Sequence, residues 1–127
     1  MSDRTIRRTL VALCVMTLAM PVMATETPWK RLDGAKLRKA FNDMELSDNT
    51  HFSYRFHADG RFDGTELNRK VLGTWRATAH EVCWNWIRPP GNEECYTVER
   101  HGHELRGSRG NFDAWWGKVV PLKAITR

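Results

Sequence analysis

The chain has 127 residues, with 20 Lys and Arg against 15 Asp and Glu, for a formal net charge of +5. A chain of this length folds around one core and is too short for two independent domains. A positive excess of this size is not the concentrated basic surface of a nucleic-acid-binding protein.

Residues 1–24 have the pattern of a cleavable export signal. Three arginines precede an uncharged stretch from Leu10 to Met20. This stretch is roughly half as long as a membrane-spanning helix must be, so we expect no stable membrane anchor. Val22-Met23-Ala24 then predicts cleavage after Ala24, and residues 25–127 are expected in the periplasm as a monomeric single domain.

Two other export routes are compatible with parts of this segment. Arg7-Arg8 is compatible with twin-arginine export, and Cys14 is compatible with lipidation. Neither has the flanking sequence that its signal requires, so ordinary cleavage after Ala24 is favoured.

Cleavage also changes the cysteine count and the charge. It removes Cys14 and leaves Cys83 and Cys95, an even pair in a compartment where disulfides form and persist. It also removes three arginines and one aspartate, which lowers the net charge to +3. A Cys83–Cys95 disulfide is therefore predicted.

Residues 33–44 predict the one helix of the chain. Apolar side chains recur there at helical spacing, and Asp33 is expected as the N-cap. The apolar face comprises Leu37, Ala40, Phe41 and Met44.

The strands begin after this helix. Residues 51–57 alternate aromatic with polar side chains, which predicts a half-buried strand. Ala58-Asp59-Gly60 predicts a turn, and residues 61–67 and 71–78 predict the next two strands. Gly73 lies within the last of these, where glycine often marks a bend or a close backbone approach.

Residues 81–100 predict a hairpin, because Arg88-Pro89-Pro90-Gly91 cannot continue a ladder and must turn. Folding about this turn places Cys83 opposite Cys95, a bridge expected to stabilise the domain by about 3 kcal/mol. The register also pairs Val82 with Tyr96 and Trp84 with Glu94. The face opposite the sulfurs then carries Val82, Trp84, Trp86, Tyr96 and Val98.

Residues 103–107 and 114–122 predict the last two strands, with a loop over residues 108–113 between them. These elements together predict a mainly β fold with one N-terminal amphipathic helix. The strands form a small antiparallel meander of about seven, closed or nearly closed as a barrel or sandwich.

Several short motifs lie between Leu32 and Leu105. They are Leu32-Asp33-Gly34-Ala35-Lys36-Leu37, the stretch from Tyr54 to Gly64, Gly73-Thr74-Trp75-Arg76, Val82-Cys83-Trp84, Cys95-Tyr96-Thr97-Val98 and Gly102. In this set the chain resembles a family of small periplasmic proteins of unknown function, most often found in alphaproteobacteria. The resemblance implies a lipocalin-like β-barrel for residues 25–127 and the periplasmic compartment. It implies no catalytic residues, and it does not reach Trp115-Trp116.

Six tryptophans in so short a chain suggest a ligand site, since indole rings stack on sugar faces. Trp75, Trp84 and Trp86 occupy alternating strand positions suited to core packing. Trp115 and Trp116 are adjacent on a strand and must face opposite sides, so one is expected outside the core. These two are the ligand-binding candidates.

Catalytic and metal sites are not expected. His101 and His103 flank Gly102, but no third ligand is tied to them by spacing. Asp59-Gly60 and Asp63-Gly64 match turns better than a calcium loop. No serine has a nucleophile context, and the two remaining cysteines are committed to each other. We therefore expect no cofactor.

A basic set surrounds the start of the predicted helix. Its side chains can meet lipid head groups or an acidic partner, but a solvated outer helix face is favoured. The set comprises Lys30, Arg31, Lys36, Arg38 and Lys39.

The leading hypothesis is a non-enzymatic periplasmic β-barrel that binds a small apolar or saccharide ligand, or an envelope component. The alternative is a periplasmic inhibitor of a protease or lysozyme, by analogy of fold alone. An enzyme is the third and least favoured class.

Overall fold

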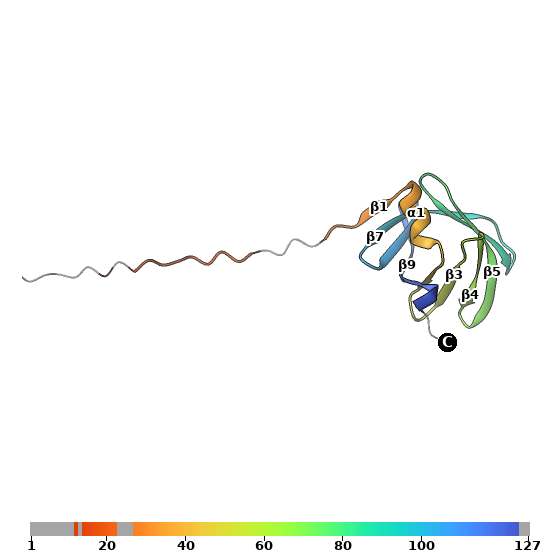
Figure 1. The fold of residues 1–127 in the computed structure, drawn as a ribbon, viewed down its shortest axis with the longest axis horizontal. Helices are drawn as coiled ribbons and strands as arrows, with labels where there is room; N and C mark the ends of the chain where they lie inside the picture. Colours follow the sequence, from red (N-terminus) through yellow and green to blue (C-terminus); the bar gives the residue numbers. More distant parts are fainter. Residues whose placement is uncertain (1–11, 13, 23–26, 125–127) are drawn as a thin grey trace, which may run out of the picture.

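The structure is a computed structural model that describes residues 12, 14–22 and 27–124. This part of the chain contains nine strands, one α-helix and one short 3-10 helix (Figure 1). They are β1 (Lys30–Leu32), α1 (Gly34–Phe41), β2 (Met44–Ser47), β3 (Phe52–Phe56), β4 (Arg61–Glu66), β5 (Arg69–Ala77), β6 (Val82–Arg88), β7 (Glu94–His101), β8 (Glu104–Arg109), β9 (Phe112–Pro121) and η1 (Leu122–Ala124).

The predicted leader falls only partly on described residues. Residues 14–22 contain no helix or strand, and the predicted cleavage site at Ala24 lies outside the described residues. None of the helices in the described ranges combines the length and the apolar character that crossing a bilayer requires.

Strands β2 to β9 form a closed antiparallel barrel of eight strands. Each pairs with the next in sequence, and β2 closes the ring by pairing with β9, from Met44 opposite Pro121 to Ser47 opposite Lys118. Strand β1 lies outside this ring. It pairs with residues 98–100 of β7, next to residues 94–96, which pair with β6. The predicted mainly β antiparallel fold is confirmed, with the barrel rather than the sandwich as its form.

The expected count of about seven strands is wrong because it lacks β1 and β2. Strand β1 has only three residues. Strand β2 begins at Met44, which the helical spacing places at the end of the predicted helix. The helix stops at Phe41 because Asp43 adopts a left-handed backbone with φ 52°, and Leu46 then pairs with Tyr54 and Val119. Ladder pairing on both edges outweighs the helical spacing of Met44.

Asp33 takes the N-cap position of α1 without capping it through its side chain. Its backbone is extended, but no side-chain hydrogen bond reaches the helix. The carboxylate instead forms ion pairs at 3.5 Å with Arg31 Nε and at 3.1 Å with His80 Nδ1. The predicted buried face is confirmed for Leu37, Ala40 and Phe41.

The loop expected over residues 108–113 is also wrong. Strand β8 continues to Arg109 and β9 begins at Phe112, so only Gly110 and Asn111 connect them. Gly110 has φ 59°, which suits glycine in a tight turn. A register irregularity between Gly107 and Ser108 explains why sequence alternation failed to show the strand.

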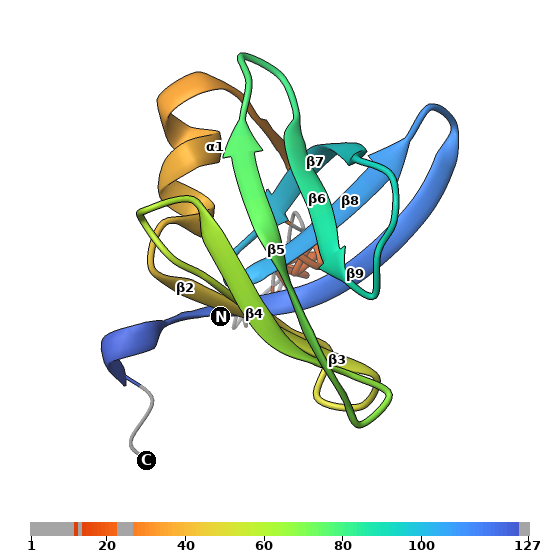
Figure 2. The ribbon, with the colours of Figure 1, turned by 90° about the vertical axis from the view of Figure 1, so that its right-hand side faces the viewer.

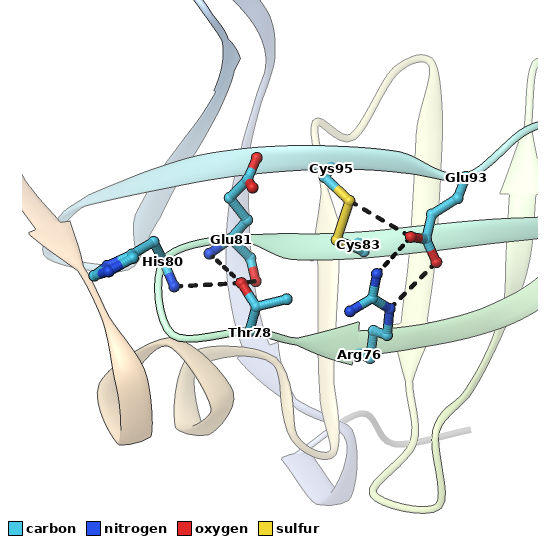
Figure 3. Close-up of a disulfide and its surroundings, with 7 residues drawn as sticks. All are labelled: Arg76, Thr78, His80, Glu81, Cys83, Glu93 and Cys95. Carbon is cyan, nitrogen blue, oxygen red and sulfur yellow. Dashed lines mark hydrogen bonds and ion pairs between the residues drawn. A yellow bond between two sulfur atoms is a disulfide. The ribbon is translucent and has the colours of Figure 1, made fainter.

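The β6–β7 hairpin has the predicted register. Val82 lies opposite Tyr96, Cys83 opposite Cys95 and Trp84 opposite Glu94. The two sulfurs form the disulfide, and Figure 3 shows it joining β6 to β7. On the same outer face the Glu93 carboxylate accepts a 2.6 Å hydrogen bond from Arg76 Nη2, which ties the β6–β7 connection to β5.

Aromatic rings fill most of the barrel interior. Helix α1 packs at one end (Figure 2), where the Phe41 ring meets the rings of Phe56 and Trp75 at 5.1 and 6.2 Å. Gly73 provides the predicted close approach, since a Cβ there would lie 2.5 Å from the Phe62 ring. The core residues are Leu32, Leu37, Ala40, Phe41, Leu46, Tyr54, Phe56, Phe62, Val71, Trp75, Val82, Trp84, Tyr96, Val98, Leu105 and Val119.

Candidate ligand site at the barrel mouth

The barrel end opposite α1 is left open. Because neighbouring strands run in opposite directions, this end gathers the β2–β3, β4–β5, β6–β7 and β8–β9 connections. We call it the mouth. Helix α1 precedes β2 and therefore covers the other end (Figure 2).

A pocket of about 310 Å³ opens at the mouth. Carboxylates and phenol hydroxyls share its wall with indole and phenyl rings. The lining residues are Asp48, Phe52, Tyr54, Glu66, Trp84, Glu94, Tyr96, Ala114, Trp115 and Trp116. Buried side chains thus fill the barrel below this pocket, and the pocket leaves room for a small ligand.

Two tyrosine–glutamate pairs form the polar part of the pocket. The Tyr96 hydroxyl donates a hydrogen bond to Glu94. Burial, together with this bond and the Glu94 charge, raises the pKa of Tyr96 well above its usual range. Burial and the charge and hydrogen bond of Glu66 raise the pKa of Tyr54 in the same way. Both phenols therefore keep their protons at physiological pH and act as donors.

The two pairs also lie close enough to influence each other. The charge of Glu94 contributes to the raised pKa of Tyr54, and the charge of Glu66 contributes to that of Tyr96. In the described part of the chain, no Lys, Arg or His nitrogen lies within 4 Å of either carboxylate. The oxygen lone pairs left over by the tyrosines can therefore accept hydrogen bonds from a ligand.

Flat rings form the rest of the wall. Phe52 stacks on Tyr54 with ring centroids 4.7 Å apart, and Trp84 stacks on Trp115 at 5.4 Å. Tyr54 meets Trp84 edge to face at 5.6 Å. Because these contacts fix the rings against one another, the pocket is preorganised.

The β2–β3 connection at the rim is fixed by Asp48. Its Oδ1 accepts hydrogen bonds from the backbone N–H groups of Thr50, His51 and Phe52 at 2.9, 2.7 and 3.1 Å. His51 Nδ1 lies 2.7 Å from Oδ2. Burial acts to raise the pKa of Asp48, but these hydrogen bonds lower it more, so the pKa lies well below its usual range.

A depressed pKa makes the contribution of Asp48 pH-dependent. The stabilisation is present above the ordinary carboxyl pKa of about 4 and is lost as the pH falls below it. We expect Asp48→Asn to lower the free energy of unfolding by about 1 kcal/mol at pH 7, with the difference shrinking toward pH 2. Urea unfolding across this range measures it. Asp113→Asn is the control, since Asp113 accepts one side-chain hydrogen bond from Ser108. An Asp48→Asn deficit that is independent of pH would contradict the assignment.

Trp115 and Trp116 face opposite sides, as adjacent strand residues must. Trp115 points inward and contacts Trp84, Tyr96 and Phe41, whereas Trp116 is 50% exposed. Both line the mouth pocket. The structure therefore places the two candidates at one site, with Trp115 in its wall and Trp116 at its outer edge.

In the described part of the chain, His101 and His103 belong to no cluster of three potential metal ligands. His101 Nδ1 lies 3.9 Å from Glu104, its ring lies 5.4 Å from that of Trp29, and His103 is exposed. Among the described residues, the one cluster of potential ligand atoms contains Cys83, Glu93 and Cys95. Its two sulfurs are already bonded to each other.

Sequence reasoning missed Tyr54, Glu66, Glu94 and Tyr96 as site residues. One signal was present: the predicted register placed Glu94 opposite the inward Trp84 and beside Tyr96, where a charged side chain faces the interior. No comparable signal marks Tyr54 or Glu66 in the sequence. Their meeting with Glu94 depends on barrel closure.

Comparison with known proteins adds no relative. The chain matches no protein-family model, no curated protein and no solved structure. The resemblance to small periplasmic lipocalin-like proteins stays a prediction, and the chemistry of the mouth is the basis for a functional assignment.

Proposed function

We propose that this protein is exported to the periplasm and acts there, without catalysis, as a binding protein for a small saccharide held at the barrel mouth. The observation that carries the proposal is the pocket itself, in which stacked rings surround two carboxylates that have no cationic partner among the described residues. The predicted leader and the disulfide are both compatible with an oxidising compartment.

The chemistry of the wall favours a saccharide over an apolar ligand. An apolar ligand would cover Glu66 and Glu94 without giving a donor to the oxygen lone pairs that the tyrosines leave free, and a carboxylate with unsatisfied lone pairs is costly to desolvate. Sugar hydroxyls donate to carboxylates, and the C–H faces of a sugar pack against indole and phenol rings. The pocket volume of about 310 Å³ suits a ligand of one or two sugar rings.

Matched variants can test this proposal. We expect Glu66→Gln and Glu94→Gln each to weaken saccharide binding about tenfold or more, because a hydrogen bond to a charged acceptor is lost. Glu45→Gln is the control, since Glu45 lies on β2 next to the inward Leu46 and therefore faces outward. Isothermal titration with a panel of envelope monosaccharides and disaccharides measures the affinities.

Tryptophan emission provides a second readout, because Trp84, Trp115 and Trp116 all line the pocket. A panel that leaves both the emission and the melting temperature unchanged would contradict saccharide binding. Equal loss of affinity in Glu45→Gln would show that the sugar binds elsewhere.

A further inference from the structure

A second pocket, of about 330 Å³, lies where β1 pairs with β7, near the end of the barrel that α1 covers. Four cationic side chains and one histidine line it. We call it the basic groove, and its ionisable residues are Lys30, Arg31, Lys36, Arg100 and His101. Arg100 and His101 come from a part of the sequence far from the basic set at the start of the helix.

The same structure separates the rest of that basic set from the groove. Arg38 Nη2 donates to the backbone carbonyl of Ala77 at 3.5 Å. Lys39 lines a different pocket, together with Asp43. Lys36, Arg38 and Lys39 are all exposed, as a solvated outer helix face requires, but of these three only Lys36 lines the basic groove.

Within the groove, Lys30 and Arg100 lie directly opposite each other in the β1–β7 ladder. Like charges in this position repel each other and destabilise the pairing. In residues 27–124 no carboxylate oxygen lies within 4 Å of the charged nitrogens of Lys30, Lys36 or Arg100. Arg100 Nε donates to the Gly102 carbonyl at 2.7 Å, which leaves the other guanidinium N–H groups for a further acceptor.

The groove wall is held in place by Trp29. Its ring lies 4.4 Å from the Arg106 guanidinium carbon and 5.4 Å from the His101 ring. Arg106 Nε in turn donates to Glu99 at 3.2 Å. This stack fixes the segment before β1 against β7 and β8, beside the pocket that Lys30 and Arg100 line.

We propose that the basic groove binds a phosphoryl group, carried by a soluble phosphate or by a lipid head group. An anion of this class neutralises the repulsion between Lys30 and Arg100, and its oxygens accept charge-assisted hydrogen bonds from the guanidinium and the ammonium groups. The site is independent of the mouth, which lies at the other end of the barrel.

Inorganic pyrophosphate is the probe for a soluble ligand, measured by isothermal titration on the exported chain. We expect Lys30→Gln and Arg100→Gln each to weaken its binding about tenfold. The control is Lys70→Gln on β5, an exposed lysine near the mouth, and its effect should stay within about twofold. Cosedimentation with phosphatidylglycerol vesicles, against phosphatidylcholine vesicles, tests the lipid source.

The melting temperature distinguishes an anion-binding role of Lys30 from a structural role. Without an anion, Lys30→Gln should raise the melting temperature because a like-charge contact is removed, whereas loss of a structural contact would lower it. Failure of both pyrophosphate and phosphatidylglycerol vesicles to bind overturns the proposal, as does equal weakening in Lys70→Gln. Glu66→Gln should leave pyrophosphate binding unchanged. Failure of saccharide binding at the mouth can therefore be told apart from failure of anion binding in the basic groove.

Discussion

Replacing Cys83 and Cys95 together with serine is expected to lower the free energy of unfolding by about 3 kcal/mol and the melting temperature by roughly 10–20 °C. The loop closed by the bridge has a sequence separation of 12 residues, and the entropy that it removes from the unfolded chain is of this size.

The position of the bridge gives it further importance. The β6–β7 ladder has three register pairs, fewer than any other ladder of the eight-stranded ring, and the cysteines form the middle pair. Loss of the bridge therefore opens the barrel wall where its backbone pairing is shortest.

Urea unfolding and thermal melting, with and without a thiol reductant, measure this effect. Reductant should bring the wild-type chain down to the stability of the double variant and leave the variant unchanged. A wild-type melting temperature that is insensitive to full reduction would contradict a structural role for the disulfide.

Gly107→Ala is expected to lower the free energy of unfolding by roughly 2–3 kcal/mol, the upper part of the range for overpacked cores. A Cβ at residue 107 would lie 2.1 Å from Cε2 of Trp115 and close to two further atoms of the same ring. Trp84, Tyr96 and Phe41 pack against the Trp115 ring, so it can yield only toward the mouth pocket that it lines. The ring must leave its place in the mouth wall.

The control is Gly91→Ala, whose Cβ would meet the Trp86 side chain at an ordinary 3.5 Å. Chemical denaturation gives the stabilities, and a red shift of tryptophan emission should report the displaced ring. In a Trp115→Ala background the Gly107→Ala change should cost much less, since the clash is gone. If Gly107→Ala behaves like Gly91→Ala, Trp115 does not pack where the structure places it.

The hairpin register was predictable because two independent constraints agreed on it. The proline-rich turn fixed the fold-back point, and the cysteine spacing fixed which residues face each other. The buried face of α1 was predictable for a similar reason, since Leu37, Ala40 and Phe41 show a clear helical period.

Other features depend on contacts between distant segments. Strand β2 exists because residues 44–47 pair with both β3 and β9, and nothing local distinguishes Met44 from a helical residue. The alternation rule showed that Trp115 and Trp116 diverge but could not say which faces inward. That choice depends on Gly107, which makes room for the Trp115 ring across the β8–β9 pair.

The mouth pocket was the least predictable feature for the same physical reason. Its two glutamates come from β4 and β7, which lie on different parts of the barrel wall and meet only when the ring closes. The basic groove likewise needs the pairing of β1 with β7.

A ¹H–¹⁵N NMR titration tests the binding site most directly. It follows the indole N–H signals of the six tryptophans while a saccharide that binds the protein is added. Saccharide at the mouth should shift the signals of Trp84, Trp115 and Trp116 and leave those of Trp29 and Trp75 in place. A saccharide that shifts none of the three mouth signals, or that shifts Trp29 alone, would contradict a ligand site at the barrel mouth.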